Sequence, residues 1–398
     1  MQINSKFTLI NNKKAMELAV VNFTNSEIIS VDTESSGYYT YYSKVCLIQI
    51  TAKGKNFIID PLSQVDMKLL DPVFKSPSIL KIFHSAPDDI KALKRDFGYS
   101  FVNIADTMYS SKLLGMEHNS LNYLVEYYHK IKLSKTEQKS NWEKRPLDQQ
   151  QLIYAALDTA YLESIWEKMK SELAAAGLLE EAISEFEKFT EEVYKGRETS
   201  QDINWHKFPN ILKFTSEERR MIYDILHYRE ERARKSNRAP FRIINNDTIN
   251  KIINEKPDEE KLIKMLGKKD GSELYKTIQN PSGPPLEKSD FPKLDENMTP
   301  HEMNRLRNLQ KWRDKIMKKR GVDHSMLLSN KQLLLLIRNP VKTLEELEEK
   351  KLMSSWKVKN YGPSLLKALG SEPYEDLISS LHPIKKKVKV ESKPSKNN

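Results

Sequence analysis

Short runs of apolar residues separated by polar turns characterise the first hundred residues of the chain. Between residues 7 and 102 these runs alternate with helical patterns, which is typical of an α/β domain. Short turns separate the first three runs and predict a hairpin meander, whereas helices between the later runs predict parallel pairs in a mixed sheet. Five strands are expected, at Ile28–Val31, Val45–Ile50, Asn56–Ile59, Ile79–Phe83 and Phe101–Ile104.

Helical patterns dominate the rest of the first domain. The helix after the fourth strand is expected to end at Gly98, because glycine commonly terminates helices. Two more helical segments are expected over Leu147–Lys170 and Ser171–Tyr194. Residues 195–212 are mixed polar and contain Pro209, so we expect a linker there.

From Ser216 onwards the chain is predicted to be all helical, with an internal repeat. Residues 228–230 (Tyr-Arg-Glu) align with residues 312–314 (Trp-Arg-Asp), and the same offset aligns residues 243–246 with residues 327–330. Two copies of one small helical module are therefore predicted. The expected domains are residues 1–200, 208–290 and 298–382, followed by a disordered basic tail at 383–398.

Two carboxylates one residue apart end the first predicted strand. Because side chains alternate faces along a strand, Asp32 and Glu34 project from the same side. Two like charges in one small volume repel each other and raise the pKa of one member, unless a cation lies between them. Hard divalent ions such as Mg²⁺ bind oxygen ligands of this kind, so the sequence predicts a metal site.

Three further residues are candidates for the same site. Asp89 lies on a helix that starts just past a strand, where open α/β sheets place their ligands. Tyr154 and Asp158 are four residues apart on one helix, so a phenol and a carboxylate share one face.

Three neighbouring polar residues have ordinary structural explanations. Asp88 is the nearest rival to Asp89 but is expected to cap the helix. His84 is expected to satisfy backbone groups at a strand end. Asp106 is expected to be a cap or turn residue rather than a fifth ligand.

Composition and charge point to a polyanionic partner. The 398 residues include 65 Lys and Arg against 55 Asp and Glu, a formal net charge of +10. Such a balance favours association with nucleic acid. The single cysteine, Cys46, excludes an internal disulfide and a cysteine metal cluster, and fits a reducing compartment. No run of 18 apolar residues occurs, so no membrane partner is expected.

The residues Asp32, Glu34, Asp89, Tyr154 and Asp158 resemble the three exonuclease motifs of the DEDDy family, and their surroundings are similar to ribonuclease D. The similarity extends over residues 40–42, 47–50, 106–107, 113–115 and 133–147, and covers roughly the first 200 residues. It implies an RNase H-like fold with a five-stranded mixed sheet. It also implies two bound divalent ions, Mg²⁺ or Mn²⁺, and hydrolysis of RNA from the 3′ end to nucleoside 5′-monophosphates.

The same resemblance implies a role for each site residue. Asp32 would bridge both ions, and Glu34 and Asp158 would complete the site that holds the attacking water. Asp89 would reach the second ion, partly through water, and Tyr154 would position the attacking water. A phenol with a pKa near 10 is a poor base, so the metal is expected to acidify the water.

Two groups of residues are candidates for contact with RNA. The family pattern implies that one basic and aromatic segment contacts the substrate. A solvated loop pinned by Trp142 would explain the same composition equally well. The candidate contact residues in this segment are Lys135, Gln138, Trp142 and Arg145. Both helical copies resemble HRDC domains, which bind nucleic acid, and the first copy is the closer match. Arg229 and Arg313 are the candidate contacts there, with a solvated helix face as the alternative.

The predicted function is a metal-dependent 3′-5′ exoribonuclease acting on structured RNA such as tRNA precursors. No obligate protein partner is evident. A cytoplasmic location is expected, because the chain starts directly on the exonuclease domain, as bacterial members of the family tend to do. A DNA 3′-5′ exonuclease and a catalytically silent RNA-binding protein are the alternatives. A helicase is excluded, because the chain lacks a Gly-x-x-x-x-Gly-Lys-Ser/Thr phosphate loop.

Overall fold

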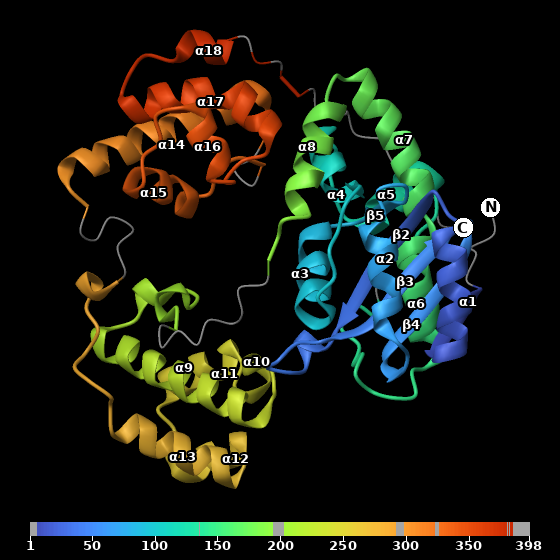
Figure 1. The fold of residues 1–398 in the computed structure, drawn as a ribbon. Helices are drawn as coiled ribbons and strands as arrows, with labels where there is room; N and C mark the ends of the chain where they lie inside the picture. The colour runs from blue at the N-terminus through green and yellow to red at the C-terminus, as the bar shows by residue number, and fades with distance from the viewer. Residues whose placement is uncertain are drawn as a thin grey trace, which may run out of the picture. The chain divides into compact units, whose positions relative to one another are not determined.

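The computed structural model describes residues 6–134, 136–193, 203–291, 298–322, 326–379, 381 and 383–384. Figure 1 shows a sheet with helices around it and further helices in the second half of the chain. The chain forms two compact units. The first holds Met1–Glu34, Val45–Tyr194 and Asn297–Asn398, and the second holds Ser35–Lys44 and Lys195–Glu296. Most of the predicted basic tail, residues 385–398, lies outside the described residues.

One mixed sheet lies at the centre of the first unit. Its strands are β1 (Phe7–Asn12), β2 (Ile28–Ser35), β3 (Val45–Ala52), β4 (Lys55–Gln64), β5 (Leu80–Phe83) and β6 (Ile104–Asp106). Their order is β1-β4-β3-β2-β5-β6. Strands β3 and β4 pair antiparallel, whereas β1 with β4, β2 with β5 and β5 with β6 are parallel. The predicted combination of a hairpin and later parallel pairs is therefore confirmed.

The expected number of five strands is wrong, because the sequence pattern misses β1. Only Ile10 is buried in this strand, so its apolar alternation is too weak to indicate a strand. The strand forms by pairing in parallel with β4, from Phe7 beside Asn56 to Ile10 beside Ile59. The last predicted strand is also displaced, since β6 begins only at Ile104.

Helices pack against this sheet (Figure 1). They are α1 (Lys13–Thr24), α2 (Asp71–Lys75), α3 (Ala86–Phe97), α4 (Thr107–Leu113), α5 (Leu121–His129), α6 (Gln149–Ala160), α7 (Leu162–Ala175) and α8 (Leu179–Phe189). Helix α3 ends as predicted, with Gly98 in the left-handed conformation at φ 71°. Helix α6 packs on β3 and β4, where Leu152, Ala155 and Ala156 contact Leu47 and its neighbours.

The continuous helix expected over Ser171–Tyr194 is wrong. Helix α7 already begins at Leu162 and stops at Ala175, and Gly177 takes φ 66° before α8 begins. A left-handed residue cannot continue a right-handed helix, and glycine adopts this conformation without steric cost. The chain therefore turns at Gly177 and separates two helices that share an amphipathic pattern.

The second half of the described chain contains helices and no strand. The first module, in the second unit, has α9 (Ser216–Ser236), α10 (Pro240–Ile243), α11 (Asn246–Glu255), α12 (Glu259–Leu266) and α13 (Lys268–Gln279). The second module, in the first unit, has α14 (Pro300–Arg320), α15 (Asn330–Arg338), α16 (Leu344–Glu349), α17 (Ser355–Gly370) and α18 (Glu375–Ser379). None of the helices in the described part of the chain is both long and apolar enough for a membrane span.

Matching caps and contacts occur at the aligned positions of the two helical modules. Thr215 and Thr299 each begin a long helix with a capping box. Asn245 and Ser329 cap the helices that follow. The arginines at matched positions make the same bond, with Arg229 donating to the carbonyl of Ile244 at 3.3 Å and Arg313 to that of Leu328 at 2.9 Å.

The second module packs against α8 of the sheet body through two ion pairs. Arg320 pairs with Glu181, and both side chains are at least 96% buried. The Nζ atom of Lys357 lies 2.8 Å from a carboxylate oxygen of Glu185, again with little exposure. Because unpaired buried charges are costly, these pairs fix the second module on the sheet body.

Candidate active site

Strand β2 presents two carboxylates on one face. Ile29 and Val31 are fully buried in the main core. The alternating residues Asp32 and Glu34 therefore project from the opposite face, as the period of a strand requires. Parallel pairing with β5 fixes the register of this strand from Ile28 to Ser30.

Helix α6 supplies the third carboxylate. Asp148 and Gln151 form a capping box that fixes where the helix begins. Further along, the hydroxyl of Thr159 lies 2.7 Å from that of Thr51 on β3, which ties the helix to the sheet. Tyr154 and Asp158 lie one turn apart, and a hydrogen bond joins their side chains.

Three of the four predicted carboxylates form one cluster. Oxygen atoms of Asp32, Glu34 and Asp158 all lie within 4.8 Å of one another. An all-oxygen set at this spacing matches the preference of hard divalent cations such as Mg²⁺ and Mn²⁺. Strand β2 and helix α6, which are distant in the sequence, thus bring three of the predicted carboxylates together.

Asp89 lies beside this cluster but outside the group of three. It is on the first turn of α3, which Ser85 introduces with a left-handed φ of 77°. Its carboxylate accepts a hydrogen bond from the hydroxyl of Thr33. Burial, followed by the negative charge of the nearby Asp32, raises the pKa of Asp89 well above its ordinary range.

Burial raises the pKa of each carboxylate in the cluster of three. Burial raises the pKa of Asp32 to about 7. The pKa values of Glu34 and Asp158 are raised well above their ordinary range, first by burial and then by neighbouring carboxylates. The charged forms of these groups are therefore unfavourable without a counter-charge. Divalent cations would supply that counter-charge, so the residues present fit the implied metal ions.

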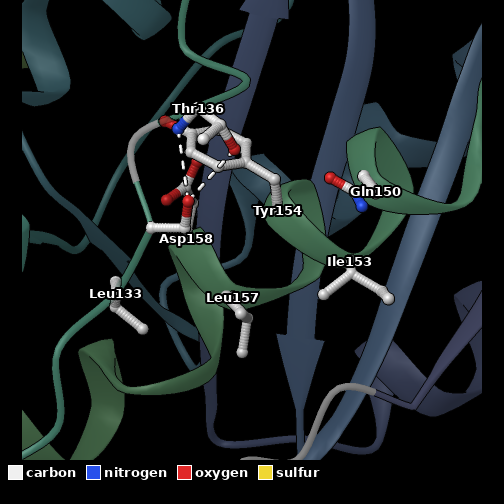
Figure 2. A pocket seen from close by; sticks show the side chains of 8 residues that line it. Leu133, Thr136, Gln150, Ile153, Tyr154, Leu157 and Asp158 are labelled. Atoms are coloured by element: carbon white, nitrogen blue, oxygen red, sulfur yellow. Dashed lines mark hydrogen bonds between the residues drawn. The ribbon is translucent and has the colours of Figure 1, made fainter.

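Tyr154 is a hydrogen-bond donor rather than a base. Burial, followed by the charges of Asp158, Glu34 and Asp32, raises the pKa of its phenol. The hydroxyl therefore keeps its proton at neutral pH. Figure 2 shows Tyr154 and Asp158 together at the edge of a pocket.

This pocket has a volume of about 200 Å³ and is lined in part by Tyr154 and Asp158. Leu133, Ile153 and Leu157 give it an apolar wall (Figure 2). Sequence reasoning missed these residues, although Ile153 and Leu157 are spaced four apart directly before Tyr154 and Asp158. It also missed Thr33, for which no sequence signal exists because its partner is distant in the chain.

Of the three neighbouring polar residues with expected structural roles, Asp106 and His84 have such roles and Asp88 does not. Asp106 caps α4 by accepting from the backbone N–H of Tyr109 at 2.8 Å, and also accepts from that of Ala86 at 2.7 Å. His84 contacts the hydroxyl of Thr107 at 2.9 Å, and burial lowers its pKa to about 4. Asp88 is exposed and makes no capping hydrogen bond, so the expectation that it caps the helix is wrong. The first backbone N–H of α3, that of Ala86, donates to Asp106 instead.

The predicted RNA-contact segment is held mainly by internal contacts. Trp142 is 2% exposed and packs with Cys46 and Leu47, so its ring is not open for stacking on a base. Arg145 forms a two-bond ion pair with Asp60, at 2.7 Å for each bond. Gln138 is exposed, and Lys135 lies outside the described residues. The structure thus favours the alternative of a loop pinned by Trp142.

The two module arginines also have internal partners. Besides its backbone contact, Arg229 donates to the side chain of Asn246 at 3.0 Å. Burial lowers the pKa of Arg229. Arg313 is half-buried and bonds to the carbonyl of Leu328. A structural role explains both residues, and their contact with RNA stays a prediction.

Comparison with sequence families identifies two parts of the chain. Residues 7–174 match the family described as 3′-5′ exonuclease, and residues 302–369 match the HRDC domain. The HRDC match lies on the second helical copy, which the sequence motifs rank as the looser of the two. An HRDC identity for the first copy stays a prediction.

Curated relatives match part of the chain. The chain is 29% identical over 266 residues to the exosome complex exonuclease RRP6 of Saccharomyces cerevisiae, which is 63% of this chain and 36% of that protein. It is 37% identical over 154 residues to exosome complex component 10 of Homo sapiens, which is 38% of this chain and 17% of that protein. The chain therefore spans about a third or less of the length of these relatives.

Solved structures extend the similarity in fold. The catalytic core of RRP6 from Trypanosoma brucei matches with a TM-score of 0.64 and 25% identity, covering 71% of this chain and 82% of that one. Escherichia coli RNase D, an exoribonuclease involved in structured RNA processing, matches with a TM-score of 0.58 and 21% identity. That match covers 92% of this chain and 100% of RNase D, and it shows a shared fold.

Proposed function

We propose that this chain, which matches the 3′-5′ exonuclease family over residues 7–174 and the HRDC domain over residues 302–369, is a ribonuclease D-like, metal-dependent 3′-5′ exoribonuclease of the DEDD type. It would remove nucleotides from the 3′ end of RNA as nucleoside 5′-monophosphates. The observation that carries the proposal is the cluster of Asp32, Glu34 and Asp158 oxygens within 4.8 Å, next to Tyr154.

Four carboxylates would hold two divalent ions. Asp32, Glu34 and Asp158 would bind one of them, and Asp89 would reach the second together with Asp32. Bound ions of this type supply a water of lowered pKa and stabilise the leaving oxygen. The ions would neutralise carboxylates whose charged forms are unfavourable in the empty cluster.

Tyr154 would orient the attacking water through its hydroxyl. The proton stays on the phenol at neutral pH, so the group acts as a donor and not as a general base. The apolar wall formed by Leu133, Ile153 and Leu157 would receive the terminal nucleotide and exclude water from its sugar and base.

Structured RNA is the proposed substrate class, with tRNA precursors as the example that the ribonuclease D resemblance suggests. The net charge of +10 and the helical modules support binding to a long polyanion. We propose that the chain acts without an obligate protein partner on short RNA, although its curated relatives are named as parts of the exosome complex. A cytoplasmic location stays a prediction of the sequence.

End-labelled RNA and DNA of equal sequence would test the proposal. The purified chain is incubated with each strand in Mg²⁺ or Mn²⁺, with Asp32→Asn as the inactive control. Stepwise shortening of RNA alone supports the proposal, and shortening of DNA alone would indicate a DNA exonuclease. Shortening of neither strand would indicate a catalytically silent RNA-binding protein.

A further inference from the structure

A second hollow in the sheet body lies beside the active-site pocket. It has a volume of about 550 Å³, which is within the range of ligand-binding clefts. Its wall includes His118, Asn122, Tyr123, Glu126, Lys132 and Leu133. We call it the α5 groove, because these residues lie on α5 or within four residues of its ends.

Leu133 lines both the α5 groove and the active-site pocket. The side-chain amide of Asn122 donates to the carbonyl of Leu133 at 3.3 Å, which holds the start of α5 against the segment that leads to the active site. A strand whose last nucleotide lies beside Asp158 can therefore continue past Leu133 into the α5 groove.

The chemistry of the groove suits a single-stranded nucleic acid. Tyr123 is only partly buried, and its ring meets that of His118 edge to face, with 5.2 Å between centroids. Aromatic rings of this kind are stacking surfaces for bases. Lys132 has a side chain that is 82% exposed, so its ammonium can reach a phosphate.

Glu126 opposes this role in part. One of its carboxylate oxygens lies 3.6 Å from the Nζ atom of Lys132. Both side chains are more than half exposed, so the ion pair is weak and a phosphate can compete for the lysine. The groove is therefore suited to moderate affinity, which lets the strand shift by one nucleotide after each cleavage.

We propose that the α5 groove binds the RNA strand immediately upstream of its terminal nucleotide, with a base against Tyr123 and a phosphate near Lys132. This inference rests on the proposed exonuclease function and assigns a substrate subsite to residues outside the carboxylate motifs.

Two substrates separate the groove from the carboxylate site. The first is the 4-nitrophenyl ester of uridine 5′-monophosphate, which has a scissile phosphodiester but no upstream nucleotide. The second is a single-stranded RNA hexamer. We expect Tyr123→Ala to raise the KM for the hexamer by about 5- to 100-fold, the range that loss of one base–aromatic stack gives. Turnover of the nitrophenyl ester should stay within about twofold of the unaltered protein, which also shows that the variant folds.

Matched variants test each part of the groove. Tyr123→Phe keeps the ring and should retain the hexamer KM. Lys132→Ala should raise the hexamer KM. Lys130→Ala removes an equal charge but should leave the hexamer KM unchanged, because Lys130 donates to the carbonyl of Tyr127. Glu126→Gln should lower it. Unchanged hexamer KM in both Tyr123→Ala and Lys132→Ala, with an active enzyme, would overturn the proposal.

Binding alone separates failure of this inference from failure of the proposed function. Fluorescence anisotropy of a labelled hexamer is measured with Asp32→Asn as the background, which needs no catalysis. Weaker binding in Tyr123→Ala supports the groove even when neither substrate is hydrolysed. Equal binding in the two proteins would overturn the groove, whatever the activity.

Discussion

The side chains of Tyr154 and Asp158 are hydrogen-bonded across one turn of α6, which places a neutral phenol against a carboxylate of the proposed metal cluster. The relationship assigns different work to the two residues. The carboxylate of Asp158 would be a ligand of an ion, whereas the phenol of Tyr154 can only donate a hydrogen bond and orient its partner.

Tyr154→Phe should therefore lower the rate without removing the metal. We expect kcat to fall by at least about tenfold, because an oriented donor is lost in the reacting complex. Mn²⁺ affinity, measured by isothermal titration calorimetry, should stay within about threefold, because no carboxylate is changed. The retained ring keeps its packing near Trp142, with 6.1 Å between centroids. A large loss of Mn²⁺ affinity would show that the phenol supports the metal site itself.

Asp32→Asn and Asp158→Asn should abolish turnover and leave RNA binding largely intact. Each change removes a charged ligand, and we expect a loss of at least about 1,000-fold in kcat. Without divalent ions, each variant should also melt at a higher temperature than the unaltered protein, because buried like charges are reduced. Calorimetric melting in EDTA checks this expectation. Retained activity in Asp32→Asn would remove the argument for a metal cluster.

Arg145→Met separates a structural role from a substrate role. Arg145 holds the buried carboxylate of Asp60 with two bonds, so its loss should lower the free energy of unfolding by about 2–3 kcal/mol. The hexamer KM should change little, because the guanidinium is already engaged. Urea unfolding and steady-state kinetics measure the two effects, with exposed Lys144→Ala as the control. A higher KM at unchanged stability would restore the interpretation as a phosphate contact.

Lys81 predicts a pH dependence of stability. It is fully buried in β5, where its ammonium donates to the carbonyls of Ser76 and Ile79. Burial lowers its pKa from 10.5 to about 8. Between these values the unfolded chain binds more protons than the folded one, so the free energy of unfolding rises with pH across that window.

The variant Lys81→Met lacks this titration. Relative to it, the unaltered protein should gain about 3 kcal/mol of stability between pH 8 and pH 10.5, by the free-energy equivalent of the pKa shift. Urea unfolding of both proteins at the two pH values gives the difference, in which the other lysines and tyrosines cancel. Parallel pH profiles would mean that Lys81 titrates as an exposed lysine.

Local rules predicted the parts of the site that depend on one element. The period of a strand placed Asp32 and Glu34 together, and the period of a helix placed Tyr154 with Asp158. Gly98 ended α3 where the sequence indicated. The sequence pattern did not predict that a helix ends near Gly177, because the amphipathic pattern continues on both sides of this residue.

Features that depend on distant partners could not be predicted in this way. Strand β1 has one buried residue, and its pairing with β4 decides its conformation. Trp142 and Arg145 looked like RNA contacts, because a basic and aromatic segment has the same composition whether it faces RNA or its own core. The contacts with Leu47 and Asp60, which are distant in the sequence, favour packing against the protein's own core.

The exposed lysines of α14 should contribute to the binding of long RNA. Lys311, Lys318 and Lys319 are exposed on the helix that carries the HRDC match. Replacing all three by glutamine should weaken binding of a long structured RNA by about tenfold or more at low salt. The slope of log affinity against log salt should fall by about 2, because each phosphate contact contributes about 0.7–0.9.

A matched variant separates local contact from net charge. Lys13, Lys14 and Lys55 are exposed on the sheet body, so their replacement by glutamine removes the same charge from another surface. That variant should bind long RNA nearly as the unaltered protein does, and both variants should hydrolyse the nitrophenyl ester equally. Equal losses of long-RNA affinity in the two triple variants would show a general charge effect, and α14 would then have no special role in holding the substrate.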